Sequence, residues 1–390
     1  MNLFAKILLS VLTVFVLTCA GFFILTLILL MGLGAFYVAI LGVVTATVLF
    51  FILELIWGWL NSKKSLMVLV VAFGLVVLSI TVFEINRAYH NNIDKIDEQG
   101  VDLTLYEPFR ENTKAVSLDE KSELTFTKDL PKLDGATALY PLYSAFARAT
   151  YPEYPYTVDF SKEDKDYVAC TNTRFAYDRL INGEVDVIFV AGPSEDQLFD
   201  AKAQGVEFNL TPIGREAFVF FVNSKNPIDN LRIDDILNIY SGEATNWSEF
   251  GGKNKEIRAF QRPENSGSQT MLQRIMEDTT LMTPPSKDVA TGMGGIISEV
   301  SAYSNYDNAI GYSFLFFASE MVRDNKIKLI SIEGIAPTRE NVANKTYPYS
   351  AEFYAVTVGT PTENTQKLID WILSEQGQYL VEKTGYTPIK

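Results

Sequence analysis

Apolar residues crowd the first 85 positions of this 390-residue chain, whereas the rest alternates between apolar and polar positions. Between residues 7 and 60 the only charged side chain is Glu54, and a second apolar run covers residues 66–83. A helix needs roughly 20 apolar residues to cross the hydrocarbon core of a bilayer. The pattern therefore predicts three membrane-spanning helices, at about residues 7–30, 33–57 and 66–83.

Lysines in the short connections indicate the orientation of these helices. Lys6 precedes the first helix, and Lys63 and Lys64 lie between the second and the third. Short loops that carry Lys or Arg remain on the cytoplasmic side of a membrane. We therefore expect a multi-pass membrane protein in which the residues after position 85 lie outside the cytoplasm.

Two alternatives stay open in the apolar region. A cleavable signal peptide over residues 1–21, with a lipid-attachment site at Cys19, is the competing interpretation of the first helix, although the apolar run continues to residue 30. Glu54 is either a functional acid within the membrane or a side chain near the cytoplasmic headgroups.

The remaining chain has the composition of a soluble protein. Residues 86–128 are polar and rich in charge, and we expect them to form a stalk. Residues 129–390 alternate between strand-like and helix-like runs, which predicts an α/β fold with a mixed or mostly parallel sheet. Strands are expected at 185–190, 217–222 and 353–358, and helices at 139–150, 174–182, 194–204, 233–240, 269–278, 296–303 and 363–374.

The length of this domain fits two lobes. We expect lobe I to comprise residues 129–213 and 346–390, and lobe II residues 214–345. The chain then crosses between the lobes near 211–215 and 347–353. The aromatic residues from Tyr312 to Phe317 are expected to pack in the core.

Charge and residue usage exclude several functions. The formal net charge is −14; residues 1–85 carry +1 and the rest of the chain −15, which argues against binding to nucleic acid. The chain has a single histidine, His90, and two cysteines, Cys19 and Cys170. It therefore lacks a Ser-His or Cys-His pair and the ligand spacing of a zinc site. We expect a binding protein without a metal or cofactor, and not an enzyme.

Three loops place small or hydroxylated residues just before an expected helix: residues 134–141, 170–174 and 260–270. Free N–H groups and the positive end of the helix dipole make such loops suitable for an oxyanion. Each loop alone is also explained by simple N-capping. The third differs from the others because Arg262 lies four residues before its Ser-Gly-Ser sequence.

Specific motifs surround these loops. The sequences IYSGEATNW (239–247) and RPENSGS (262–268) resemble the substrate-binding proteins of phosphate ABC importers, and GMGG (292–295), AIGYSF (309–314) and EKTGYTPIK (382–390) are also similar. The resemblance covers about residues 130–390. It implies a two-lobed, type II periplasmic-binding-protein fold that holds inorganic phosphate, or a similar oxyanion, in its cleft and hands it to an ABC permease.

The resemblance also implies which residues bind the anion. Hydroxyl and N–H donors come from all three loops, Arg262 supplies charge, and Glu264 orients Arg262. The expected site comprises Thr137, Ala138, Leu139, Thr173, Arg262, Glu264, Ser266, Gly267 and Ser268.

One position departs from the family pattern. The family usually has an aspartate just after the third strand, where its carboxylate accepts the proton of hydrogen phosphate and rejects sulfate. Ala191 occupies that position here. The sequence therefore predicts phosphate or a related oxyanion as the ligand. A second hypothesis is that the protein is a phosphate sensor or assembly protein that signals through its helices, since one helix suffices for anchoring.

Overall fold

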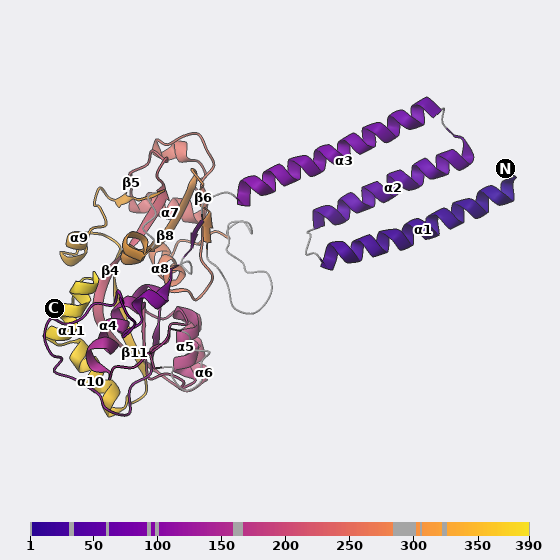
Figure 1. The fold of residues 1–390 in the computed structure, drawn as a ribbon. Helices are drawn as coiled ribbons and strands as arrows, with labels where there is room; N and C mark the ends of the chain where they lie inside the picture. Colours follow the sequence, from indigo (N-terminus) through magenta and orange to yellow (C-terminus); the bar gives the residue numbers. More distant parts are fainter. Residues whose placement is uncertain are drawn as a thin grey trace. The chain divides into compact units, whose positions relative to one another are not determined.

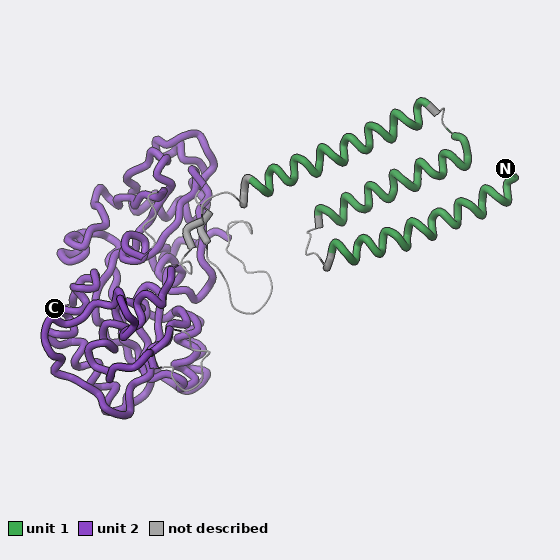
Figure 2. The backbone as a smooth tube through the Cα atoms, viewed as in Figure 1, with its two compact units in different colours: residues 1–93 green, residues 94–390 purple. Residues whose placement is uncertain are grey.

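The computed structural model describes residues 2–30, 35–59, 62–91, 95–97, 101–158, 167–283, 302–304, 306–321 and 326–389. The chain divides into two compact units, residues 1–93 and residues 94–390 (Figure 2). The GMGG motif at 292–295 lies outside the described residues.

The first unit consists of three apolar helices, α1 (Leu3–Leu30), α2 (Ala35–Trp57) and α3 (Ser62–Asn91). All three are long and apolar enough to cross a membrane. The third helix extends beyond the expected residues 66–83 at both ends. Nothing in the flanking sequence interrupts a helix, and an ion pair between Arg87 and Glu84 at 3.5 Å supports its last turns.

Side-chain contacts join the three helices to one another. The Trp57 Nε1 of α2 donates to the Ser10 Oγ of α1 at 3.1 Å. The rings of Phe36 and Phe83 stack at 3.8 Å between α2 and α3. Glu54 is only 4% exposed, so its carboxyl group lies among the helices. The three helices of this unit therefore pack against one another and do not act as separate anchors.

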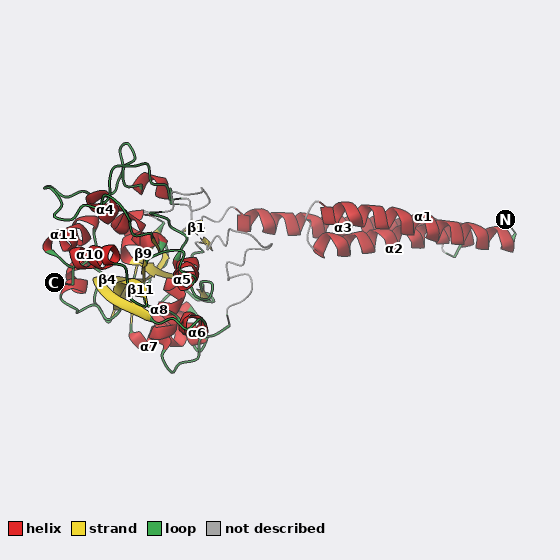
Figure 3. Cartoon of the chain, turned by 90° about the horizontal axis from the view of Figure 1, so that it is seen from below, coloured by secondary structure: helices red, strands yellow, loops and turns green. Residues whose placement is uncertain are grey.

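The second unit is built on a seven-stranded mixed sheet, which confirms the expected α/β class (Figure 3). The two strand pairs β2–β3 and β6–β8 are parallel, and the other pairs are antiparallel. The path of the sheet is β2 (Leu133–Gly135), β3 (Val187–Val190), β11 (Ser350–Val358), β4 (Phe208–Asn223), β8 (Ala309–Phe314) and β6 (Arg258–Ala259), with β9 (Ile327–Leu329) also paired to β4.

Strand β4 runs through both halves of this unit (Figure 1). Its residues 208–217 pair with β11, and its residues 218–222 pair with β8. The sequence predicted only its second half as a strand, because Pro212 and Gly214 interrupt the apolar pattern of the first. Pro212 is tolerated there since β4 has a partner on one side only at that point.

The two largest buried clusters lie in two lobes on either side of this crossing. Lobe I packs around Leu133, Tyr143 and Phe189, and lobe II around Phe220 and Tyr312. The helices of lobe I are α4 (Tyr140–Thr150), α5 (Thr173–Ile181), α6 (Glu195–Ala203), α10 (Glu363–Ile372) and α11 (Glu375–Thr384), and those of lobe II are α7 (Ile233–Ser241), α8 (Gly267–Met276) and α9 (Arg339–Ala343). Two short pairs complete the strands, β1 (Lys95–Asp97) with β7 (Ala302–Ser304) and β5 (Asn230–Leu231) with β10 (Ser331–Ile332).

Two regions differ from the sequence expectations. Residues 101–128, which we expected to be a stalk, place Tyr106 and Phe126 in the core of lobe I. Burial of scattered aromatic residues has no periodicity that a sequence pattern can detect. Residues 302–304 form strand β7 and not the end of a helix, while the rest of the expected helix at 296–303 lies outside the described residues.

Candidate functional site

The first predicted loop follows strand β2 and leads into α4. Residues Thr137–Leu139 form a single 3₁₀ turn directly before α4. The N–H of Ala136 donates to the Phe189 carbonyl at 2.9 Å, which fixes the loop beside β3. Gly135 is required here because a Cβ atom would collide with the same carbonyl. The Leu139 N–H, which we expected to face the anion, donates instead to the Ala136 carbonyl at 2.9 Å.

A buried carboxylate ties the first loop to the second. Asp134 has no exposed surface and accepts from the N–H and the hydroxyl of Thr171 at 2.8 and 2.7 Å. Arg179 of α5 forms an ion pair with it at 2.5 Å. Burial raises the pKa of Asp134, and these donors oppose that rise. The network holds the two loops in one fixed arrangement, and sequence reasoning missed it, although a charge at the end of an apolar strand was a signal.

In the second loop, one residue caps helix α5 and its neighbour is the candidate for ligand binding. Asn172 adopts a left-handed conformation (φ 75°), and its side chain accepts from the N–H groups of Arg174 and Phe175. Asn172 is thus the N-cap of α5. Thr173, the first helical residue, is 7% exposed, and the cap does not use its hydroxyl.

The third loop holds Arg262 in place through its backbone. The Arg262 N–H lies 2.9 Å from both the Gln269 Oε1 and the Tyr312 hydroxyl oxygen. Tyr312 also donates to Gln269. The Arg262 residue is only 9% exposed, so its guanidinium lies largely within the protein. The sequence predicted Tyr312 as core but gave no sign that Gln269 and Tyr312 would position this loop.

The rest of the third loop forms the start of α8. Ser266 is its N-cap and accepts from the Gln269 N–H at 3.3 Å. The first N–H groups of a helix have no partner within it, and Gly267 and Ser268 supply such groups at the start of α8. Glu264 is exposed and accepts from Gln273 Nε2 at 2.8 Å. Its expected role in orienting Arg262 stays a prediction.

The structure brings the second and third loops into contact. A Cβ atom on Gly267 would lie 3.1 Å from the Thr173 Oγ1 and 3.6 Å from the Ala191 Cβ. Ala191 directly follows β3, where the family comparison of the sequence placed it. The starts of α5 and α8 and the end of β3 therefore meet at one point, with one helix start from each lobe.

Further polar contacts join the lobes beside this point. Asn265, which has a positive φ of 65°, accepts from the Ser194 hydroxyl at 2.8 Å and donates to Asp196 at 3.3 Å. The Arg274 guanidinium of α8 donates to the Pro193 carbonyl at 2.7 Å. Sequence reasoning did not identify Asn265 or Arg274, because their partners are about 70 to 80 residues away along the chain.

Chemically, this arrangement offers donors. It combines helix N-termini, hydroxyl groups and one guanidinium, a set that suits an oxyanion. Among the residues that the structure describes, no group of three His, Cys, Asp or Glu side chains could hold a metal ion.

Comparison with known proteins identifies the domain. The sequence profile of the PBP superfamily domain matches residues 127–376. The chain belongs to the PBP superfamily. The match covers most of the two lobes of this PBP superfamily protein, up to the start of α11, and leaves its three apolar helices outside.

Two curated relatives are identical to the PBP superfamily protein at about a quarter of the aligned positions. The phosphate-binding protein PstS of Bacillus subtilis is 26% identical over 286 residues, which cover 72% of this chain and 86% of the relative. The phosphate-binding protein PstS of Borreliella burgdorferi is 25% identical over 232 residues, covering 56% and 81%.

Solved structures show a similar coverage. A putative phosphate ABC transporter substrate-binding protein with bound phosphate from Clostridium perfringens covers 67% of this chain and 99% of its own, at 23% identity and a TM-score of 0.48. An ABC-type phosphate transport receptor from Vibrio cholerae covers 66% and 99%, at 20% identity and a TM-score of 0.47.

Proposed function

We propose that this PBP superfamily protein captures inorganic phosphate, or a closely related oxyanion, outside the cytoplasm and delivers it to an ABC permease. One observation carries the proposal: the starts of α5 and α8 meet where Thr173 faces Gly267, next to the loop that holds the nearly buried Arg262. Two curated relatives with the name phosphate-binding protein support the choice of anion.

The binding chemistry follows from this geometry. Each helix start directs N–H groups and a partial positive charge toward the meeting point. Arg262 adds charge and can form two parallel hydrogen bonds to one anion. Although the chain carries a net charge of −14, most of its surface charges are distant and screened by salt. Short contacts in a site that excludes water outweigh that distant field, so an acidic protein can still bind an anion.

Binding without chemical turnover fits the donor set. In this proposal the lobes close on the anion between Thr173 of lobe I and the α8 start of lobe II. The three apolar helices keep the protein at the membrane, and the lysine pattern puts the lobes outside the cytoplasm.

A second candidate function is phosphate sensing. The contacts between Trp57 and Ser10 and between Phe36 and Phe83 give the helices a packed arrangement that simple anchoring does not require. Purification of the full chain with its native partners distinguishes the two functions: a permease supports delivery, and a histidine kinase supports sensing.

Titration calorimetry of the full chain in detergent micelles tests the choice of ligand. We expect phosphate and arsenate to bind with submicromolar to micromolar dissociation constants, that is with roughly −8 kcal/mol or better. Sulfate is the matched oxyanion without a proton to donate. Binding of sulfate alone, or of none of the three anions, contradicts the proposal.

The Arg262→Ala variant should lose at least about 100-fold in phosphate affinity, because it removes charge-assisted hydrogen bonds worth about 1.5–3 kcal/mol each. Calorimetry measures the loss, and circular dichroism confirms that the variant folds. Arg232→Ala is the matched control, since the Arg232 side chain is 65% exposed and pairs with Asp235 on α7. Unchanged affinity in Arg262→Ala removes Arg262 from the site.

A further inference from the structure

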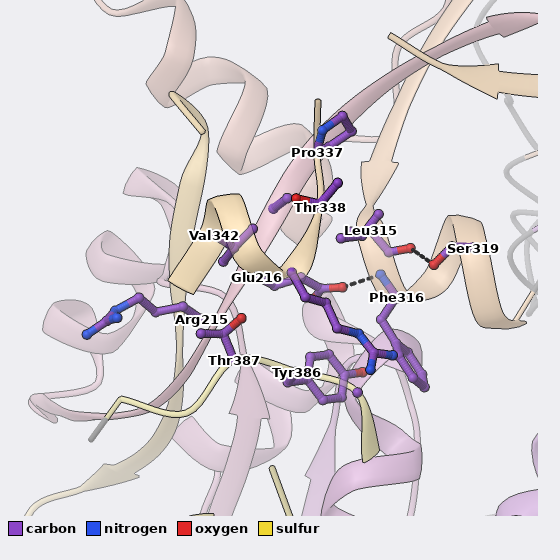
Figure 4. A pocket seen from close by; sticks show the side chains of 13 residues that line it. Arg215, Glu216, Leu315, Phe316, Ser319, Pro337, Thr338, Val342, Tyr386 and Thr387 are labelled. Carbon is purple, nitrogen blue, oxygen red and sulfur yellow. Dashed lines mark hydrogen bonds between the residues drawn. The ribbon is translucent and has the colours of Figure 1, made fainter. Parts of the chain in front are cut away.

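A cavity of about 160 Å³ lies where the lobes join, apart from the three loops described above (Figure 4). Strand β4 contributes Glu216 to it, the helix α9 region contributes Arg339, and the segment after α11 contributes Tyr386. Cavities of roughly this size hold a molecule as large as benzene. The cavity can therefore accept an organic molecule of a few carbon atoms, and both lobes would contact it.

The cavity has a buried floor and an exposed mouth. Glu216, Phe316 and Tyr386 at the floor are each at most 6% exposed. Ser319, Thr338 and Arg339 at the mouth are exposed. Ala217, Leu315, Pro337 and Val342 contribute apolar surface to the walls, beside the polar residue Thr387.

Glu216 and Arg339 are charged residues that line the cavity. The Glu216 side chain points toward Phe316 and accepts its N–H at 2.5 Å (Figure 4). The Arg339 guanidinium lies against Gly385, where a Cβ atom would collide with it. It is close enough to Glu216 to stabilise the charged carboxylate, yet no ion pair joins the two among the described residues. Arg215 points away and pairs with Glu352 at 3.8 Å.

From this geometry we propose that this cavity between the lobes is a second ligand site, which binds a small aliphatic carboxylate. Its carboxylate would lie between Glu216 and Arg339, and its hydrocarbon part would pack on Phe316 and Val342. Phosphate fits less well, because it carries polar oxygens on every side and the apolar part of the lining would leave some of them without a partner. This proposal does not depend on the function of the three loops.

The ionisation of Glu216 favours such a ligand at neutral pH. Burial raises the pKa of Glu216 to about 8, while the N–H of Phe316 and the charge of Arg339 oppose the rise. Below that pH the carboxyl group is mainly protonated and donates a hydrogen bond to the ligand. Arg339 then supplies a positive charge. Above it, two carboxylates would face each other, and binding should weaken.

A hydrogen bond links the floor of the cavity to the first loop. The Tyr386 hydroxyl at the cavity floor donates to the carbonyl of Ala138 in the first loop. A ligand that contacts both lobes changes the balance between their arrangements, and any such coupling is reciprocal. The carboxylate should therefore alter phosphate affinity, and phosphate should alter carboxylate affinity by the same factor.

Calorimetric titration of the full chain in micelles with butyrate tests the site, with butan-1-ol as the uncharged ligand of similar size. At about pH 6.5 we expect butyrate to bind and butan-1-ol not to bind. Arg339→Gln should weaken butyrate binding at least about tenfold, whereas Arg262→Ala should leave it unchanged. Ser319→Trp, an exposed substitution that obstructs the mouth, gives a second test independent of charge.

The pH dependence gives the sharper result. Butyrate affinity should fall up to about tenfold per unit above about pH 8 in the native chain. Glu216→Gln should retain its affinity there, because an amide donates without titrating. Absence of butyrate binding by the native chain overturns the proposal. Butyrate affinity equal to that of the native chain in both Arg339→Gln and Ser319→Trp also overturns it. Loss of binding in Arg262→Ala would assign butyrate to the three loops instead.

Discussion

Single residues determine which anion this protein can distinguish. Ala191 lies at the end of β3, near Thr173 and Gly267, and its methyl group offers no acceptor for a proton. Hydroxyl and N–H donors cannot distinguish hydrogen phosphate from sulfate, because both anions accept hydrogen bonds. Discrimination between the two anions requires an acceptor in the site. Leaving a donor without a partner, or placing an anion oxygen against an acceptor, costs more free energy than the loss of one attractive contact.

The Ala191→Asp variant should therefore sharpen selectivity. The new carboxylate accepts the proton of hydrogen phosphate but repels sulfate, so the affinity for sulfate should fall about 100-fold relative to that for phosphate. Competition binding with both anions measures the ratio. Ala191→Asn is the neutral control of the same size, and it should change the ratio only a few-fold. An unchanged ratio in Ala191→Asp would place position 191 away from the ligand.

At the scale of elements, the loops are useful only because their helices are fixed to the sheet. Asp134 at the end of β2 joins the second loop through Thr171 and helix α5 through Arg179. A buried ion pair contributes little net stability compared with an apolar pair, but loss of one partner leaves an uncompensated charge. The network thus fixes the geometry of two loops at once.

Asp134→Asn should destabilise the second unit by about 3 kcal/mol or more, because Arg179 loses its buried counter-ion. Urea unfolding followed by tryptophan fluorescence measures the change in the free energy of unfolding. Glu184→Gln is the matched control: Glu184 also pairs with Arg179, at 3.3 Å, but its side chain is 54% exposed. The control should cost about 1 kcal/mol or less. Equal effects of the two substitutions would contradict the role of the buried network.

At the scale of the whole domain, direct contacts between the lobes stabilise their present arrangement. Asn265 of lobe II bonds to Ser194 and Asp196 of lobe I. Such contacts favour the present arrangement of the lobes whether or not a ligand is bound. A ligand between the lobes then dissociates only when these bonds also open.

Asn265→Gly removes this contact without backbone strain, because glycine adopts a φ of 65° readily. Loss of the side-chain bonds, each worth about 1 kcal/mol, should weaken phosphate binding roughly 5- to 30-fold, mainly through faster dissociation. Stopped-flow kinetics separates the two rate constants. Asn112→Gly is the control, since Asn112 also has a positive φ, of 58°. A slower association rate with normal dissociation would argue against a closing contact.

The buried carboxyl group of Glu216, in the cavity between the lobes, should also make the stability of the domain depend on pH. The pKa of Glu216 rises from 4.5 to about 8 on folding. Its contribution to stability is therefore fully present below pH 4.5 and is lost as the pH rises to about 8, at up to about 1.4 kcal/mol per unit. Glu216→Gln should lose this slope and gain stability relative to the native chain as the pH rises. Urea unfolding at several pH values measures this dependence. Glu340→Gln is the control, because Glu340 is exposed. The same slope of unfolding free energy against pH in the native chain and both variants would contradict the prediction.

Local patterns predicted much of this architecture. The three apolar helices followed from composition, and α4, α5, α6, α7, α8 and α10 followed from apolar periodicity and helix-start residues. The long strand β4 and the packing of residues 101–128 did not follow, because a proline, a glycine and scattered aromatic residues obscure the apolar alternation. The separate helix α11 was also missed, since it begins at Glu375, directly after the end of α10.

The sequence by itself determined the class of the fold and the superfamily, and it predicted three loops as the anion site. These depend on short-range features: apolar period, capping residues and motifs within a few positions of one another. Only the tertiary structure showed that Thr173 faces Gly267, that Asp134 and Asn265 tie distant segments together, and that Glu216 and Arg339 line one cavity. Each of these depends on contacts between residues far apart along the chain, which no local pattern encodes.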